Sequence, residues 1–238
     1  MYQLTLSTGV NPKPSSVIGA DFNKDNQQDI FNTGYFGKPT LYSASPGSSP
    51  QGFAVGDFNN DNRLDLVVAN NGNQNLGIFF GKGNRTFFEQ ILYTPSNSFL
   101  PVSVATSDFN NDDMSDVVTV DNANHVVYVL LSLCNGSFTV STAYDTLFNT
   151  WPTSISIVYL NNDSELDIVV GQLFGAEILV FLGLGNGTYS VSKVSPNSDQ
   201  GGPNFAIIAD LDNDNCSDVV AAKGGVHVIE IMYGMCDG

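Results

Sequence analysis

The chain has 238 residues, of which 42% are hydrophobic, and its 24 acidic against 8 basic residues give a formal net charge of −16 at pH 7. This charge excludes binding of the nucleic-acid phosphate backbone and electrostatic docking to anionic lipid. The sequence has no apolar run of 18 or more residues, so membrane insertion is not expected.

Apolar segments rich in β-branched and aromatic residues alternate along the chain with segments rich in Asn and Gly. None of them has the 3.6-residue period of a helix, so the chain is predicted to be all-β. The first segment, residues 2–7, alternates like a strand and lacks the basic and apolar regions of a signal peptide. The cysteines Cys134, Cys216 and Cys236 are odd in number and show no metal-type spacing.

A short acidic loop recurs five times, at residues 21–29, 57–65, 108–116, 159–167 and 210–218. The loops after the first begin 51 residues apart, and the first begins 36 residues before the second. These loops and their immediate neighbours hold 17 of the 24 acidic residues. An X-Pro pair precedes each loop: Lys13-Pro14, Ser49-Pro50, Leu100-Pro101, Trp151-Pro152 and Gly202-Pro203. Markers that keep one register over most of the chain indicate a repeat architecture.

Each complete repeat is predicted to contain four short antiparallel strands. In the copy around the third loop they fall at about residues 103–109, 116–120, 125–133 and 137–144, and the last two are joined by an Asn-Gly turn. Radial repetition of such four-stranded units is the architecture of a β-propeller. We therefore expect one domain, residues 1–238, folded as a five-bladed β-propeller.

The ends of the chain predict how the ring closes. The last copy stops at Asp237-Gly238, before its fourth strand, and residues 2–7 are expected to supply that strand and close the ring. The first copy is 15 residues shorter than the others and is expected to lack one strand.

The loop at residues 57–65 places side-chain oxygens at its positions 1, 3, 5 and 9. Ca²⁺ binds six to eight oxygens and tolerates irregular geometry, so this pattern is typical of a calcium loop. Carboxylates at such density repel one another unless a cation neutralises them. The alternative is an Asx-rich turn held by hydrogen bonds from the backbone alone.

The five loops in register resemble the FG-GAP/VCBS repeat family, which includes the propellers of integrin alpha chains. Family loops read Asp-x-Asp/Asn-x-Asp-Gly-x-x-Asp, and the resemblance implies calcium ligands at side chains 1, 3, 5 and 9 and at the carbonyl of position 7. The implied ligands are Asp21, Asn23, Asp25, Gln27 and Asp29; Asp57, Asn59, Asp61, Arg63 and Asp65; Asp108, Asn110, Asp112, Met114 and Asp116; and Asp210, Asp212, Asp214, Cys216 and Asp218.

Three positions of the loops carry further expectations. Position 6, usually Gly in the family, is Asn26, Asn62, Asp113, Ser164 or Asn215, and a positive φ is expected there. Position 2, which is Phe22, Phe58, Phe109, Leu160 or Leu211, is expected to pack between blades. The fourth loop begins with Tyr159 in place of Asp and retains Asn161, Asp163, Glu165 and Asp167. An EF-hand is excluded, because strands flank the loops and no Glu stands at position 12.

The remaining candidate groups do not form a catalytic set. His125 and His227 each lie 17 residues after the start of a loop and are interpreted as strand-edge residues. No Ser-His-Asp arrangement or phosphate-binding loop is present, so no catalysis is expected. Asn84, Asn135 and Asn186 stand in Asn-x-Ser/Thr sequons at one repeat position. They are candidate glycosylation sites or simply hairpin-turn residues.

These features predict a calcium-binding, extracellular propeller of the adhesion type, which binds a protein or glycan without catalysing a reaction. The sequence leaves the oligomeric state open and is compatible with a monomeric ring. Millimolar calcium outside cells would keep even weak sites occupied. Recognition is expected on the face opposite the acidic loops, where the single tryptophan, Trp151, precedes a proline. The alternative function is a lectin that uses this face, and Trp151 is a candidate ligand platform or a buried structural residue.

Overall fold

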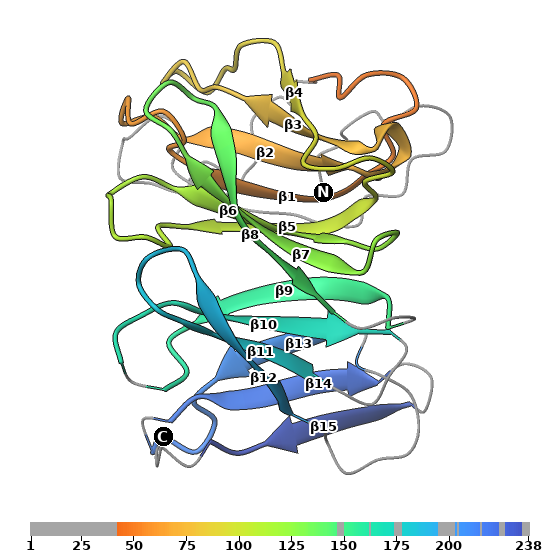
Figure 1. The fold of residues 1–238 in the computed structure, drawn as a ribbon, viewed down its shortest axis with the longest axis vertical. Coiled ribbons are helices and arrows are strands. Elements are labelled where there is room, and N and C mark those ends of the chain that lie inside the picture. The colour runs from red at the N-terminus through yellow and green to blue at the C-terminus, as the bar shows by residue number, and fades with distance from the viewer. Residues whose placement is uncertain are drawn as a thin grey trace, which may run out of the picture.

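The computed structural model describes residues 42–146, 150–161, 163–173, 178–194, 203, 205–214, 216–223 and 227–234. These residues form fifteen strands and one 3-10 helix, η2 (Asn71–Asn73) (Figure 1). Within this part of the chain, no helix is long and apolar enough to cross a membrane.

The strands form four antiparallel sheets, each following chain order. The first sheet contains β1 (Pro50–Gly56), β2 (Asp65–Asn70), β3 (Asn75–Phe79) and β4 (Ile91–Tyr93). The second contains β5 (Pro101–Ser107), β6 (Asp116–Asp121), β7 (Val126–Ser132) and β8 (Phe138–Asp145). The third contains β9 (Pro152–Val158), β10 (Asp167–Gln172), β11 (Ile178–Gly183) and β12 (Tyr189–Val194). The fourth contains β13 (Phe205–Ala209), β14 (Asp218–Lys223) and β15 (Val228–Met232).

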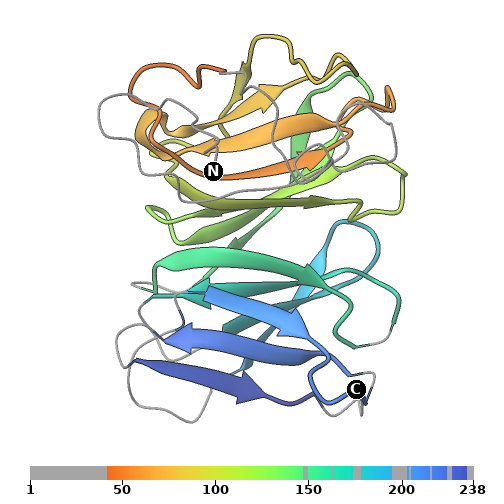
Figure 2. The same ribbon diagram turned by 180° about the vertical axis from the view of Figure 1, so that it is seen from behind.

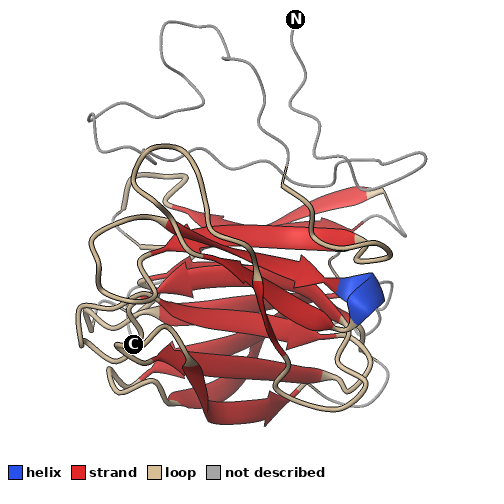
Figure 3. Ribbon diagram, turned by 90° about the horizontal axis from the view of Figure 1, so that it is seen from above, coloured by secondary structure: helices blue, strands red, loops and turns tan. Residues whose placement is uncertain are grey.

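Successive sheets pack face to face, and the first strands of neighbouring sheets, β1, β5, β9 and β13, lie side by side (Figure 2). Three buried apolar clusters fill the spaces between the first and second, second and third, and third and fourth sheets. The connecting loops gather at the two ends of the strands (Figure 3). The all-β prediction is confirmed, and this stack of antiparallel meanders fits a β-propeller.

The strands of the second sheet lie within a few residues of their predicted positions. Each complete sheet begins with its proline: Pro50, Pro101 and Pro152 are the first residues of β1, β5 and β9. A register irregularity follows these prolines in the pairing of each first strand with the second. A proline is tolerated there because the first residue of a strand and a bulge need no ladder N–H.

The described residues contain four sheets, whereas the sequence predicts five blades. The loop 21–29 with its ligands Asp21, Asn23, Asp25, Gln27 and Asp29, the short first blade, and the strand at residues 2–7 lie outside the described residues. The fourth sheet has three described strands.

The outer edge of the fourth sheet differs from the outer edges of the other three sheets. The third strands β3, β7 and β11 are largely buried, and a fourth strand pairs with each of them. In contrast, β15 exposes Val228, Ile229 and Ile231, and Ile229 is 71% exposed. Among the described residues, no strand pairs with the outer edge of β15. Apolar side chains at such an edge are typical of a strand that pairs with a further strand.

Candidate metal centres

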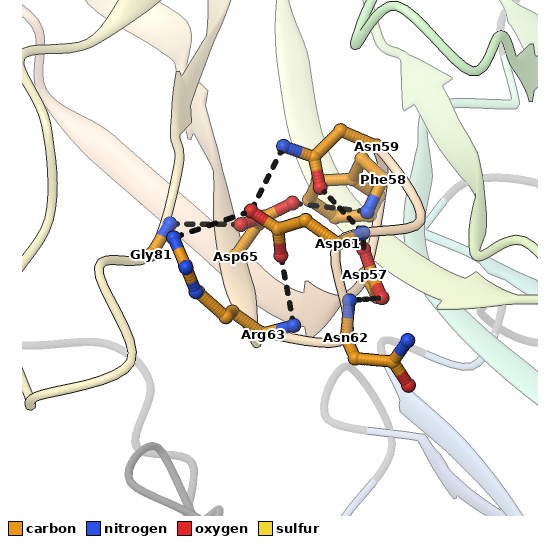
Figure 4. A network of polar contacts seen from close by, with 8 residues as sticks. All are labelled: Asp57, Phe58, Asn59, Asp61, Asn62, Arg63, Asp65 and Gly81. Atoms are coloured by element: carbon orange, nitrogen blue, oxygen red, sulfur yellow. Dashed lines mark hydrogen bonds and ion pairs between the residues drawn. The ribbon is translucent and has the colours of Figure 1, made fainter.

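The loop between β1 and β2 is closed by its own side chains (Figure 4). The two carboxylate oxygens of Asp57 accept hydrogen bonds from the N–H groups of Asp61 (3.1 Å) and Asn62 (2.6 Å). Oδ1 of Asp61 accepts from the N–H of Arg63 at 2.8 Å. Oδ1 of Asn59 accepts from the N–H of Asp61 at 3.2 Å. The side chains at positions 1, 3 and 5 therefore all point into one turn of backbone.

The loop between β5 and β6 repeats this geometry. Asp108 accepts from the N–H groups of Asp112 (3.1 Å) and Asp113 (2.8 Å), and Asp112 accepts from that of Met114 (2.9 Å). Asn110 Oδ1 accepts from the N–H of Asp112 at 3.2 Å. Two loops separated by 51 residues thus have the same internal bonding, as a repeated sequence requires.

The aspartate at position 9 is the buried anchor of each loop. Asp65, Asp116, Asp167 and Asp218 are fully buried. In Asp116, Oδ2 accepts from the N–H of Phe109 (2.9 Å) and Oδ1 from that of Ser132 (2.8 Å). The other three make the same two contacts, with position 2 of their own loop and with a residue after or at the end of the third strand. This carboxylate therefore ties the loop to two strands.

Burial makes three of these anchors, Asp65, Asp116 and Asp167, expensive to ionise in the absence of a cation. Desolvation raises the pKa of Asp65 and of Asp116 to about 6, against the opposing effect of their backbone hydrogen bonds. The neighbouring carboxylates of the same loop raise both pKa values further. Desolvation also raises the pKa of Asp167. A divalent cation beside these groups would favour the ionised form.

The loops use left-handed backbone at two positions rather than one. At position 6, Asn62, Asp113 and Ser164 have φ of 63°, 66° and 67°, which confirms the expectation for these residues. At position 4, Asn60, Asn111 and Asn213 have φ of 58°, 60° and 63°. Asn is the non-glycine residue that adopts this conformation most readily. The recurrence of Asn at position 4 is the sequence feature that could have predicted this second left-handed residue. Asn26 and Asn215 lie outside the described residues.

The last loop brings three carboxylates together. One oxygen from each of Asp210, Asp212 and Asp218 lies within 4.8 Å of the other two. Oxygens that share a Ca²⁺ ion at about 2.3–2.6 Å lie at such separations. Asp214 closes the same loop: its Oδ1 accepts from the N–H of Cys216 at 2.7 Å. The donor set is oxygen only, which fits a hard cation.

The fourth loop keeps the backbone of the others without their first carboxylate. Tyr159 is 55% exposed. Asp163 Oδ1 accepts from the N–H of Glu165 at 2.8 Å, and Asn161 Oδ1 accepts from that of Asp163 at 3.3 Å. The Glu165 side chain contacts the loop 108–116 of the second sheet, where it accepts a hydrogen bond from Asn111 Nδ2 at 3.1 Å. The side chains can therefore form this turn without an aspartate at position 1.

Neighbouring loops contact one another across the sheets. The N–H of Ser115 donates to the carbonyl of Asp57 at 3.1 Å, and Ser115 Oγ accepts from the N–H of Asp57 at 3.1 Å. Ser217 Oγ donates to the carbonyl of Tyr159 at 3.0 Å, so the equivalent pair of residues joins the third and fourth sheets, here with the hydroxyl as the donor. The loops therefore form a continuous band along one face, and each loop also fixes its neighbour.

The residues at position 2 follow the expectation in part. Phe58 packs against Phe138 of the second sheet, and Phe109 against Tyr189 of the third. Leu160 is partly buried against the cluster between the third and fourth sheets. The expectation is wrong for Leu211, which is 45% exposed. A position 2 side chain is buried by contacts with the next sheet, as Phe58 and Phe109 are, and no such contact is described for Leu211. Phe22 lies outside the described residues.

Two residues at position 7 have side chains with further contacts. Arg63 Nη1 lies 3.7 Å from Asp61 Oδ2, a weak surface ion pair. Cys216 is disulfide-bonded, whereas Cys134 is a free thiol. Neither contact involves the backbone carbonyl that the family resemblance assigns as a ligand.

The three sequons lie on exposed turns at the same end of the strands as the acidic loops. Each Asn side chain bonds back to the turn: Asn135 Oδ1, for example, accepts from the N–H of Ser137 (3.0 Å) and from its Oγ (2.6 Å). Asn84 and Asn186 make the same pair of contacts with Thr86 and Thr188. This bonding gives the asparagines a structural role in the turn.

The opposite face carries a pocket of about 580 Å³. Trp151 lines it together with Gln51, Asn71, Asn122 and His125, and is 45% exposed. Trp151 is therefore a surface residue of the expected face and not a buried structural one. His227 lies at the corresponding position of the fourth sheet and is exposed.

The fold and the loops define a class: a β-propeller of repeated antiparallel blades with an acidic loop between the first two strands of each. Residues 57–119 and 108–170 match the model of the FG-GAP-like repeat. These residues therefore carry two FG-GAP-like repeats, which supports the family resemblance of the loops. The comparison with curated proteins finds no match.

Solved structures share the fold at low identity. A lectin from Agrocybe aegerita, described for its specific recognition of non-reducing terminal N-acetylglucosamine, is 15% identical with a TM-score of 0.58. That match covers 92% of this chain and 71% of the lectin. Virginiamycin B lyase from Staphylococcus aureus is 14% identical with a TM-score of 0.53, over 81% of this chain and 58% of the lyase. At such identities the similarity supports the fold alone.

Proposed function

We propose that this chain is a calcium-binding interaction module in which Ca²⁺ occupies the acidic loops. The observation that carries the proposal is the convergence of Asp210, Asp212 and Asp218 within 4.8 Å. The equivalent side chains of the loops 57–65 and 108–116 already point into one turn, so a small rearrangement would complete their sites. The loop 21–29 is proposed as a fourth site from its sequence.

The role proposed for the ions is structural. A cation in a loop neutralises the carboxylates around a buried anchor such as Asp116, whose pKa is otherwise raised to about 6 by burial. Because each loop is bonded to the next, through contacts such as Ser115 to Asp57, an ion also stiffens the junction between two sheets. Repetition on successive sheets favours such a role over that of a single active site, and we propose no catalytic activity.

The chain is proposed to work outside the cell. Disulfides such as that of Cys216 persist in oxidising compartments. Extracellular calcium is abundant enough to fill sites of modest affinity. The exposed sequons at Asn84, Asn135 and Asn186 are open to glycosylation there, so we propose a secreted or ectodomain glycoprotein with an adhesion-type partner.

Restoring the missing carboxylate of the fourth loop tests the calcium sites. Tyr159→Asp is expected to add one calcium ion to the stoichiometry measured by isothermal titration calorimetry. It should also raise the melting temperature in calcium but not in EDTA. The loop already has the required backbone, with φ of 67° at Ser164, and Tyr159 is exposed, so its removal costs little packing.

The matched control is Tyr159→Asn, which places a neutral side chain of the same size at position 1. It should leave the stoichiometry unchanged or produce a weaker site. A Tyr159→Asp protein that binds no more calcium than the parent would contradict the assignment of position 1 as a ligand.

We further propose that the ring has five blades and that residues 2–7 close it by pairing with β15. The exposed apolar edge of β15 supports this, because the equivalent strands β3, β7 and β11 are buried beside a fourth strand. In the alternating segment, Leu4 and Leu6 share one face and Thr5 lies on the other.

Charge on the apolar face of that segment should open the ring. Leu4→Asp with Leu6→Asp is expected to lower the stability by about 3 kcal/mol or more, since two leucines lose their burial. The uncovered β15 edge should also cause concentration-dependent association in sedimentation velocity. Thr5→Asp is the matched control and should have a small effect. Equal stability of all three proteins would refute this closure.

A second candidate function is carbohydrate binding. The specific observation in its favour is the similarity of fold to a lectin that recognises terminal N-acetylglucosamine. The proposed partner is then a glycan rather than a protein, bound on the face opposite the acidic loops. A glycan array probed with the calcium-loaded protein tests this, and absence of binding to every printed glycan would contradict it.

A further inference from the structure

The pocket on the face opposite the acidic loops is built by three successive sheets. Gln51 comes from β1, and Asn71 begins η2 in the same sheet. Asn122 and His125 lie in the turn between β6 and β7 of the second sheet. Trp151 immediately precedes β9 of the third sheet. Its volume of about 580 Å³ lies within the range of small-molecule sites.

No Asp, Glu, Lys or Arg side chain lines this pocket. This is notable in a chain with 24 acidic residues, whose carboxylates gather mainly in the acidic loops. A phosphate, sulfate or carboxylate ligand would need a cationic partner, and an ammonium ligand would need a carboxylate. The lining offers amides, the imidazole of His125, an indole and apolar groups, which suit an uncharged ligand with hydroxyl groups.

Two of the amides are held in fixed positions by bonds across the sheets. Asn71 Nδ2 donates to the carbonyl of Pro101 at 3.2 Å, and Asn122 Nδ2 donates to that of Pro152 at 3.4 Å. These contacts are equivalent in the repeat. No described residue donates a hydrogen bond to either amide oxygen. Both oxygens are thus preorganised acceptors for ligand hydroxyls, which lowers the ordering cost of binding.

Trp151 supplies the apolar platform. Its φ of 50° is unusual for a bulky residue, and its carbonyl accepts from the N–H of Leu173 at 2.9 Å, which helps to fix the backbone. Ser49, the equivalent residue before the first proline of β1, has a φ of 43°, so this backbone conformation is a feature of the repeat. The negative π face of an indole attracts the polarised C–H groups of a sugar ring, whereas the hydroxyls around the ring need hydrogen-bonding partners.

We propose that this pocket binds a neutral saccharide, with a sugar ring stacked on Trp151 and its hydroxyls bonded to Asn71 and Asn122. The inference rests on the carbohydrate-binding candidate function and specifies its site and ligand class. Acidic sugars are disfavoured, because no lysine or arginine lines the pocket. Binding here does not use the acidic loops, so calcium affects it only through the stability of the propeller.

Trp151 is the single tryptophan of the chain, so its own fluorescence reports occupancy of the pocket. The calcium-loaded protein is titrated with glucose, galactose, mannose, N-acetylglucosamine and their β-linked disaccharides. A glycan array that also carries sialylated and sulfated glycans covers larger ligands. We expect a saturable change of emission with at least one neutral saccharide, and array signals restricted to neutral glycans.

Variants then locate the site by calorimetry with the saccharide that binds. Trp151→Ala should weaken binding at least about tenfold, the equivalent of 1.4 kcal/mol. Asn122→Ala should weaken it to a smaller extent. Phe88→Ala is the matched control, because Phe88 is an aromatic residue of similar exposure, 52%, that lies outside the pocket. Melting curves of all variants in calcium confirm that each is folded.

The possible failures are distinguishable. Saccharide binding that survives Trp151→Ala would overturn the site and leave the lectin function standing. Binding restricted to acidic glycans would overturn the neutral class. Absence of binding to any saccharide would overturn both the site and the carbohydrate-binding function, whereas the proposal of calcium in the loops has its own test.

Discussion

Removal of calcium is expected to lower the melting temperature of this protein by more than about 10 °C. An ion at about 100 times its dissociation constant stabilises the fold by about 2.7 kcal/mol per site. With calcium bound as proposed, each of the three complete loops among the described residues would contribute to this total. A domain of this size loses about 2–4 °C of melting temperature per kcal/mol. The lost ions also leave the crowded carboxylates of each loop to repel one another.

The measurement is differential scanning calorimetry in about 1 mM Ca²⁺ and in excess EDTA. Mg²⁺ with EGTA is the control for ionic strength and divalent charge. It should restore little, since Mg²⁺ requires a more regular octahedral site and dehydrates reluctantly. Identical melting curves in calcium and in EDTA would mean that the loops are hydrogen-bonded turns without a structural ion.

Asp116→Ala is expected to destabilise the protein by about 3–5 kcal/mol, with or without calcium. Its two oxygens accept from the N–H groups of Phe109 and Ser132 inside the protein, at 2.9 and 2.8 Å. Truncation leaves both donors buried without a partner, at a cost of about 1–3 kcal/mol each. The substitution also leaves a cavity, and in calcium it removes an ion ligand as well.

Asp112→Ala is the control in the same loop, because Asp112 is exposed and is also a proposed ligand. It should cost little in EDTA and should remove the contribution of one ion in calcium. Urea titration of both variants in the two conditions separates an anchor from a ligand. Equal losses for the two variants in EDTA would contradict the anchoring role of position 9.

The repeat made much of this structure predictable. A 51-residue period with a proline before each loop and a turn rich in Gly and Asn after it places the strands of the second sheet to within a few residues. The positive φ of Asn62 and Asp113 follows from the family pattern, since these residues stand where glycine is usual. These features depend on local sequence. Because the same local pattern occurs five times, its interpretation in any one repeat is less ambiguous.

Features that depend on neighbouring sheets were not predictable. Leu211 matches Phe58 and Phe109 in the repeat, yet it is exposed, whereas Phe58 and Phe109 pack against aromatic residues of the next sheet. The pocket at Trp151 joins Gln51 and Asn122, which come from different sheets and are far apart in the sequence. The sequence placed Trp151 on the right face but gave no sign of these partners.

The most direct test of the central claim is a crystal structure of the protein grown in calcium, with diffraction data collected for the anomalous signal of calcium. We predict an anomalous peak in each complete acidic loop, at about 2.3–2.6 Å from the side-chain oxygens of positions 1, 3 and 5. The loop 210–218 should be the clearest, because Asp210, Asp212 and Asp218 already converge there. Loops that show no anomalous density in saturating calcium would contradict the account.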